Sequence, residues 1–382
     1  MLCPTGLSCR VLGSYSKMGR TQVPTKTLRA LGALTILLLN GCGTDSKIPQ
    51  MPVEHILFVG DSFTHGRYLP IRLYNSGGTQ SRINGSALVF DENFGATGAR
   101  QESATEYGPY GGIPGIFAEL AFEAGIPYDV HIEAISMTSL HDNYEAASEV
   151  IDQARWNTIV LQELSSRPLP YKLTGDPTSD PASFCKSVQT IERSVHSIAP
   201  NAHIYLYETW ARADLAERLS GDPSSPDFSS TYRKNLTTLG NANHDAYYSA
   251  ASHDPAITGV APTGDAWLRA WQQEVANPDP FVDANASLPS LWYGLNQVNE
   301  PQIRTPDYLH PGIYGAYLDG LVLFEEITGR DVRMFGANEI AATALGIPAG
   351  VTVQLQQISW EAVTEQNPAL IDPSVDPCTI PH

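Results

Sequence analysis

A short apolar run near residue 56 ends in a tight turn that carries a serine. Residues 56–59 are apolar without interruption, and Gly60, Asp61 and Ser62 follow them. So short a run, apolar at every position, is typical of a strand buried on both faces of a parallel sheet. Ligands of such sheets bind at the carboxyl ends of the strands, so Ser62 is a candidate nucleophile. The alternative is structural, because Asp and Ser are also favoured where a helix begins.

A second motif, far downstream, supplies the groups that a nucleophilic serine needs. Asp307 and His310 lie three residues apart, just before the helical-looking residues 314–328. A serine hydroxyl becomes a good nucleophile only when a base takes its proton. His310 can act as that base while Asp307 orients its ring and stabilises its cation. The two motifs together predict a serine hydrolase with the chain order Ser, Asp, His.

These motifs resemble the sequence blocks of the SGNH/GDSL hydrolase superfamily of esterases and lipases, and the resemblance extends over residues 54–329. It implies Ser62 as nucleophile, His310 as general base and Asp307 as its orienting partner. It also implies an α/β fold of the flavodoxin-like kind, a three-layer α/β/α sandwich around a parallel sheet of about five strands. We expect no cofactor.

The blocks that should stabilise an oxyanion depart from the commonest pattern of this superfamily. The strand-like residues 158–161 are followed by Gln162 and Glu163, which resembles a subgroup with a Leu-Gln-Glu block. The amide of Gln162 is a donor like that of asparagine, so we expect it to join the backbone N–H of Ser62 in an oxyanion hole. After the strand-like residues 130–135 the superfamily has a glycine that contributes its N–H to the oxyanion hole. This chain has Ser136 and Met137 there, and the backbone N–H of either could still serve, because the donor is a main-chain group.

The first 41 residues are typical of a targeting segment. They hold five basic residues and no acidic one, and the apolar residues 30–39 are too few to span a bilayer. Residues 39–42 resemble the bacterial lipobox, which implies a lipidated Cys42 and an exported lipoprotein of the cell envelope, in the periplasm or at the outer membrane. Only the lipid would contact the membrane, and residues 42–52 would form a linker. Met18 is a candidate for the true start, and the alternative is an uncleaved leader with an ordinary cysteine.

The net charge limits the kinds of molecule that this protein can bind, and the cysteine content limits its possible disulfides. Without the leader, 18 basic and 41 acidic residues remain, a net charge of −23, which disfavours nucleic acid. Cys185 and Cys378 are the cysteines left after Cys42, and in an exported protein they are either a disulfide or two free thiols.

Strand-like and helix-like stretches alternate along residues 53–329, which favours one domain with a parallel sheet covered on both faces. The remaining strands are expected at residues 130–135, 158–161, 203–207 and 257–261, and the helices at residues 116–124, 143–154, 181–198, 264–275 and 315–328. Three insertions are expected, at residues 67–110, 211–232 and 277–306. Residues 330–382 should form a partly helical extension that packs back on the domain.

Four further side chains are candidate substrate contacts. Asp61 and His65 flank the nucleophile, and Trp210 and Trp292 belong to the neighbourhood of the insertions, where their rings would suit stacking on sugars. The alternatives are that His65 caps a helix and that both tryptophans pack the interior. Of the histidines considered as metal ligands, His141, His244 and His253, none has a partner at ligand spacing, so we expect no metal.

The sequence therefore predicts an enzyme that cleaves carboxylic esters through an acyl-enzyme, with O-acetyl or short-chain acyl esters of carbohydrates as the expected substrates. One alternative is a lipase, thioesterase or acyltransferase with the same triad. The other is a surface lipoprotein that binds a glycan without turning it over.

Overall fold

A seven-stranded parallel sheet organises the part of the chain that the computed structural model describes, residues 52–78, 88–281, 287–294 and 306–380. Its strand order is β2-β3-β4-β1-β5-β6-β7. The strands are β1 (Glu54–Gly60), β2 (Ser76–Gly78), β3 (Val89–Asp91), β4 (Tyr128–Ala134), β5 (Thr158–Leu161), β6 (His203–Tyr207) and β7 (Gly259–Ala261). The leader with Cys42 and most of the linker lie outside the described residues.

Strand β1 lies in the middle of the sheet, between β4 and β5. Ile56 and Phe58 point into one hydrophobic core, and Leu57 and Val59 point into the other. Successive side chains of a strand face opposite sides, so a strand with a core on each side is apolar at every position. This confirms the expected buried strand and the α/β class.

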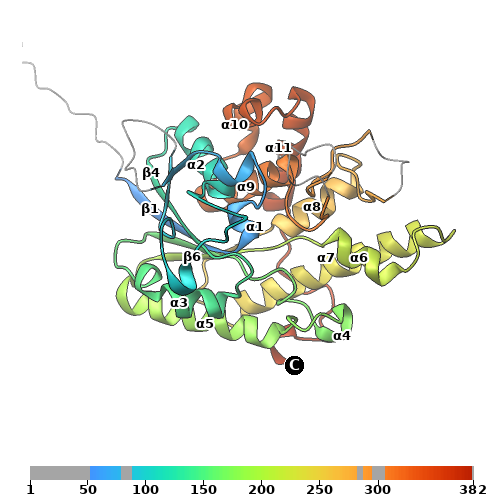
Figure 1. Ribbon diagram of the computed structural model, residues 1–382, viewed down its shortest axis with the longest axis horizontal. Coiled ribbons are helices and arrows are strands. Elements are labelled where there is room, and N and C mark those ends of the chain that lie inside the picture. The colour runs from blue at the N-terminus through green and yellow to red at the C-terminus, as the bar shows by residue number, and fades with distance from the viewer. Residues whose placement is uncertain (1–51, 79–87, 282–286, 295–305, 381–382) are drawn as a thin grey trace, which may run out of the picture. The chain divides into compact units, whose positions relative to one another are not determined.

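Helices cover both faces of the sheet (Figure 1). On one face pack α2 (Gly112–Glu123), α8 (Thr263–Gln272) and α9 (Ile313–Thr328), and on the other α3 (Leu140–Ile151) and α5 (Pro181–Ile198), while α7 (Phe228–Ser252) contributes to both cores. The shorter helices are α1 (Ser62–His65), α4 (Tyr171–Thr174), α6 (Ala213–Ser220) and α10 (Ile340–Ala344), with 3-10 turns η1 (Ile71–Leu73), η2 (Gly98–Arg100), η5 (Val332–Asn338) and η6 (Pro377–Thr379). None of the helices in the described part of the chain is long and apolar enough to cross a membrane.

The sheet has two strands more than expected, because β2 and β3 lie within residues 67–110, where we expected an insertion. The segment 211–232, also expected as an insertion, holds α6 and the first turn of α7. Residues 79–87, 282–286 and 295–305 of the expected insertions lie outside the described residues.

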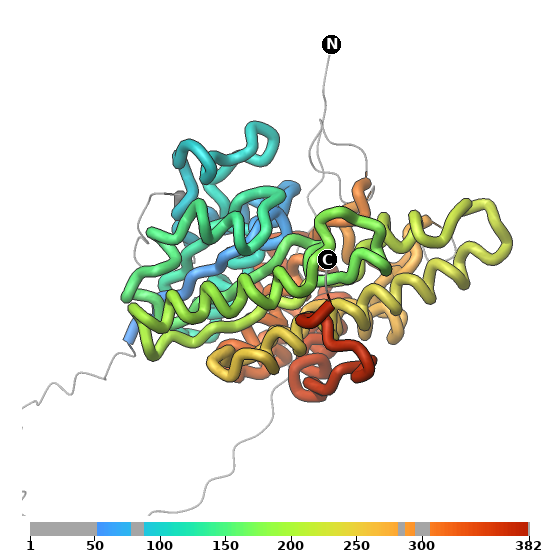
Figure 2. The backbone as a smooth tube through the Cα atoms, turned by 90° about the horizontal axis from the view of Figure 1, so that it is seen from below, coloured from blue at the N-terminus to red at the C-terminus, as the bar shows by residue number. Residues whose placement is uncertain are grey.

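The C-terminal extension, residues 330–382, packs on the domain through its described residues. Its longest helix, α11 (Ala349–Thr364), lies against α8 and α9. Cys185 and Cys378 form a disulfide with their Cα atoms 5.6 Å apart, which ties η6 to α5. The end of the chain consequently lies against α5 and α7 (Figure 2).

Candidate active site

The turn after β1 places Ser62 at the carboxyl edge of the sheet. Gly60 ends the strand, and Ser62 is the first residue of α1. Asp61 is the N-cap, and its Oδ1 accepts a hydrogen bond of 2.9 Å from the backbone N–H of Phe63. A side chain at position 60 would collide with Thr64, which explains the glycine. The residue that caps the helix is therefore Asp61, and the hydroxyl of Ser62 is left to bond with another partner.

That partner is His310, 248 residues away in the chain. Ser62 Oγ lies 2.8 Å from His310 Nε2, and His310 Nδ1 lies 2.7 Å from Asp307 Oδ2. The backbone N–H groups of Leu309 and His310 each donate to Asp307 Oδ1 at 3.1 Å. The structure thus brings together the three residues that the two sequence motifs supply, in hydrogen-bonded order.

The environment of Asp307 keeps it ionised. Burial acts to raise its pKa, but the hydrogen bond and charge of His310, with the hydroxyl of Tyr68, outweigh burial and leave the pKa below its usual value. Tyr68 donates to Asp307 Oδ2 at 2.6 Å. An ionised carboxylate accepts the Nδ1–H of the imidazole, so that the lone pair of Nε2 faces the serine. Sequence reasoning missed Tyr68, which carries no motif of its own.

Trp210 and Trp292, which we expected to stack on substrate, are both buried, with 1% and 0% of their surface exposed. Trp210 is stacked between Phe63 and Trp267, at 4.4 Å from each ring. Its Nε1 donates to Leu309 O at 3.0 Å. It therefore supports both the nucleophile turn and the loop that carries the histidine.

Trp292 supports the same loop. Its ring stacks on Trp271 at 4.6 Å, and its Nε1 donates to Ala211 O at 3.1 Å. It pairs with Pro311 in an isolated antiparallel bridge, and the N–H of Tyr293 donates to His310 O at 2.8 Å. Packing the interior, the alternative for both tryptophans, is what the structure shows.

Asp61 and His65, the other two expected substrate contacts, are also buried, and each has a polar side-chain atom that bonds within the protein. Asp61 is 2% exposed and caps α1, and burial raises its pKa to about 6. His65 is 0% exposed and stacks on Tyr110 at 4.2 Å. Its Nε2 lies 2.9 Å from Ser136 Oγ. Burial, then the nearby charge of His310, holds the pKa of His65 well below 6.5, so its imidazole is neutral.

Gln162 does not offer its amide to an oxyanion, which corrects the sequence expectation. Its Oε1 accepts from the backbone N–H of Asp61 at 2.9 Å and from Thr64 Oγ1 at 2.7 Å. Its Nε2 donates to Glu163 O at 2.6 Å, and the residue is 1% exposed. Gln162 therefore braces the turn behind Ser62. Glu163 is buried as well, with a pKa raised to about 8.

The loop after β4 presents a different candidate donor. Gly60 is opposite Ala134 in the sheet, and Ile135 N–H donates to Gly60 O, so this loop adjoins the nucleophile turn. Met137 has a φ of 64° and is 79% exposed, and its N–H bonds to none of the described residues. Left-handed backbone is uncommon outside glycine. Met137 thus adopts a conformation that glycine favours, and it lies in the segment where the sequence left the backbone N–H of Ser136 or Met137 open as a donor.

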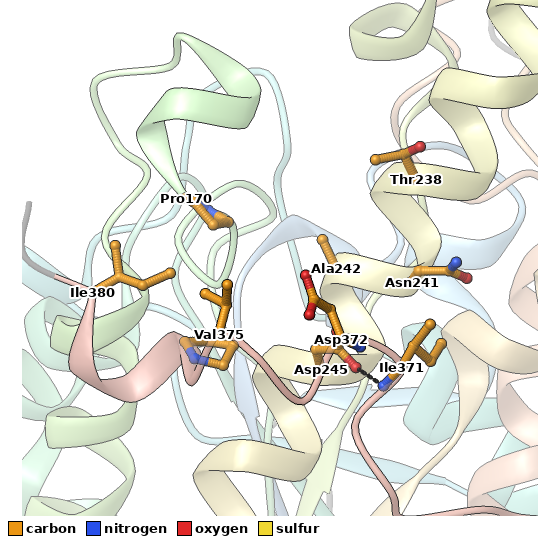
Figure 3. Close-up of a pocket in the computed structure, with 10 residues that line it drawn as sticks. Pro170, Thr238, Asn241, Ala242, Asp245, Ile371, Asp372, Val375 and Ile380 are labelled. Carbon is orange, nitrogen blue, oxygen red and sulfur yellow. Dashed lines mark hydrogen bonds between the residues drawn. The ribbon is translucent and has the colours of Figure 1, made fainter.

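A pocket of about 290 Å³ lies elsewhere, between α7 and the C-terminal segment (Figure 3). Pro170, Thr238 and Val375 are among the residues that line it, and Asp245 holds its wall by accepting a 2.6 Å hydrogen bond from the backbone N–H of Ile371. Its lining includes none of the residues Ser62, Asp307 and His310.

Comparisons with known proteins give no family. No protein-family model and no curated protein matches the sequence. Among solved structures, a DUF4886 family protein from Bacteroides uniformis is 12% identical, with a TM-score of 0.47, over 84% of this chain and 98% of that one. An acetylxylan esterase from Geobacillus stearothermophilus is 14% identical (TM-score 0.37; 71% and 91% covered), and a phospholipase A1 from Streptomyces albidoflavus is 11% identical (TM-score 0.39; 71% and 97% covered). Likenesses this distant carry no functional argument, which rests on the geometry above.

Proposed function

We propose that this protein hydrolyses carboxylic esters through an acyl-enzyme formed on Ser62. The observation that carries the proposal is the continuous hydrogen-bonded chain from Ser62 Oγ through His310 to Asp307, with distances of 2.8 and 2.7 Å. The low pKa of Asp307 adds to it, because an ionised Asp307 favours the positive charge that His310 acquires when it takes the serine proton.

In the proposed reaction, Ser62 Oγ attacks the carbonyl carbon of the ester while His310 Nε2 accepts its proton. The tetrahedral intermediate collapses, His310 returns the proton to the leaving alcohol, and the acyl group stays on Ser62. Water then attacks the acyl-enzyme, with His310 again as base, and releases the acid. Asp307 remains ionised throughout.

We assign the oxyanion to two backbone donors. The N–H of Ser62 is the first of α1 and has no partner within the helix. The N–H of Met137 is the second, on the adjoining loop. Two converging backbone N–H groups are the usual way to stabilise a tetrahedral oxyanion, and each contributes about 100- to 1000-fold in rate.

We expect small acyl groups as substrates, because Ser62 and His310 are only 5% and 3% exposed. With both tryptophans buried, the stacking argument for sugars is lost, and O-acetyl esters of carbohydrates remain as the class that the sequence resemblance implies. On the leader sequence alone, we further propose that lipidation of Cys42 holds the enzyme at the cell envelope.

The test is hydrolysis of p-nitrophenyl acetate, butyrate and octanoate by residues 44–382, beside acetylated xylo-oligosaccharides and peptide mapping of a fluorophosphonate adduct. We expect kcat/KM to be highest for acetate, to fall at least about 10-fold by octanoate, and the adduct to lie on Ser62. Rates that rise with chain length would favour a lipase or thioesterase. Absence of turnover and of labelling at Ser62 would favour a protein that binds a glycan without cleaving it.

A further inference from the structure

Three metal-ligating side chains converge at the amino end of β1 and β4, away from the catalytic candidates. His55 on β1 is paired with Asp129 on β4, and His131 follows two residues later on the same face of the sheet. Asp129 Oδ2 lies 3.0 Å from His55 Nδ1 and 3.1 Å from His131 Nε2. One possible ligand atom from each of the three residues lies within 4.8 Å of the other two.

We propose that His55, Asp129 and His131 bind a divalent transition metal ion, with Zn²⁺ as the best fit. Two imidazoles and one carboxylate form a ligand set that Zn²⁺ favours. Ligand atoms about 2.0 to 2.1 Å from a tetrahedral ion lie roughly 3.4 Å apart. The two separations given above are shorter by only a few tenths of an ångström, so small side-chain movements admit the ion, with a water at the fourth position.

The surroundings of His131 prepare it as a ligand. Its Nδ1 lies 2.7 Å from Glu92 Oε1, and Glu92 is held in turn by Arg155. A carboxylate on one imidazole nitrogen fixes the tautomer whose other nitrogen faces a metal. The ring also contacts Trp156 edge-on at 5.0 Å, and the residue is 4% exposed, so its orientation is set by packing.

The charge of this cluster favours a cation. With neutral imidazoles, the carboxylates of Asp129 and Glu92 outnumber the one guanidinium of Arg155 that pairs with Glu92. A divalent cation offsets this excess of negative charge. It can enter from solvent, since the side chains of His55 and Asp129 are 37% and 31% exposed.

The ion would act on stability rather than on ester cleavage. His55 precedes Gly60 by five residues on one strand, a distance of about 17 Å at 3.3 Å per residue. The site therefore lies at the opposite end of β1 from Ser62. By joining β1 to β4, a bound ion stabilises the folded state by mass action.

The test uses the metal-free chain, titrated with Zn²⁺ against a chromogenic chelator and followed by thermal unfolding. We expect one Zn²⁺ per chain and a Tm that rises with Zn²⁺ concentration. His55→Gln and Asp129→Asn should each weaken binding at least about 100-fold and abolish the rise in Tm. His203→Gln is the matched control, because His203 is an exposed histidine at the start of β6 whose ring bonds to none of the described residues.

Two further readouts make the outcome decisive. Co²⁺ in place of Zn²⁺ should give the visible absorption of a tetrahedral site, and His55→Gln should lose it. Ester kcat/KM should be the same with and without Zn²⁺, which separates this proposal from the proposed function. Equal Zn²⁺ affinity in His55→Gln and His203→Gln, or no stoichiometric binding to the unaltered chain, would overturn the site.

Discussion

Two serine–histidine pairs lie near the carboxyl end of β1, and their arrangement suits only one of them to nucleophilic catalysis. Ser62 Oγ is 2.8 Å from His310 Nε2, and Ser136 Oγ is 2.9 Å from His65 Nε2. Ser62 and His65 even belong to the same short helix, α1. The residue types are the same and the distances nearly so. The difference in suitability for catalysis therefore has to come from a third group.

That third group is a carboxylate, and it binds a different member of each pair. Asp307 binds Nδ1 of His310, which leaves the Nε2 lone pair for the serine. Glu106 instead accepts the hydroxyl proton of Ser136 at 2.6 Å, so this serine can only accept from His65. An imidazole that donates to a serine cannot be its base. The comparison teaches that the order of the hydrogen bonds, rather than the presence of three residue types, makes a nucleophile.

The most direct test of the difference between the two pairs is to remove the hydroxyl of each serine in turn. Ser62→Ala should lower kcat for p-nitrophenyl acetate by about 10⁴-fold or more, because no acyl-enzyme can form. Ser136→Ala should cost less than about 10-fold, since it removes only a support of the Met137 loop. Circular dichroism and Tm would show that both variants fold. A Ser136→Ala loss equal to that of Ser62→Ala would mean that the pairs have been assigned the wrong way round.

A second contrast exchanges each carboxylate for its amide. Asp307→Asn should lower kcat by about 10³- to 10⁴-fold, because an amide does not hold the imidazole in the required tautomer or stabilise its cation. KM should change little, since Asp307 lies behind His310 and touches no substrate. Glu106→Gln should lower kcat by less than about 10-fold. Initial rates over a range of ester concentrations separate the two constants, and equal kcat losses in both amide variants would contradict the different roles of the carboxylates.

What could be read from the sequence was whatever a contiguous pattern encodes. The apolar residues 56–59 predicted a central strand with two cores, and the motifs around Ser62 and His310 predicted which residues would meet. Both depend on local spacing and on a rule of α/β topology, and the structure brings them together as expected. The catalytic roles themselves stay predictions until turnover is measured.

What could not be read was the direction of a side chain and the partners it finds. Gln162 has the right amide in the right block, but its oxygen and nitrogen are both engaged in bracing the turn. The side chain of Trp210 has one polar atom, Nε1, and its ring is buried between the rings of Phe63 and Trp267. His55 and His131 are 76 residues apart, and only the parallel pairing of β1 with β4 brings them together. Each of these features depends on register or packing, which single-sequence patterns do not specify.

The smallest expected effect concerns the protonation of His65, the histidine that is not a base. Its pKa is held well below 6.5, by burial first and then by the charges of His310, Arg72 and Arg67. The unfolded chain therefore binds the proton more readily than the folded one below pH 6.5, so His65 destabilises the fold as pH falls, by up to about 1.4 kcal/mol for each pH unit.

His65→Gln isolates this contribution, because its amide N–H can still donate to Ser136 but does not titrate. Buried carboxyls act in the opposite sense, since the pKa of Asp91 is raised to about 7 and that of Glu163 to about 8, and protonating them favours the folded state as pH falls. These groups are common to both proteins and cancel in the difference. The free energy of unfolding of the unaltered chain minus that of His65→Gln, from urea titrations at pH 5 to 8, should be constant above pH 7 and decrease below pH 6.5. A difference that does not vary with pH would mean that His65 titrates alike in both states, and the contrast between a neutral support and a working base would then have to be abandoned.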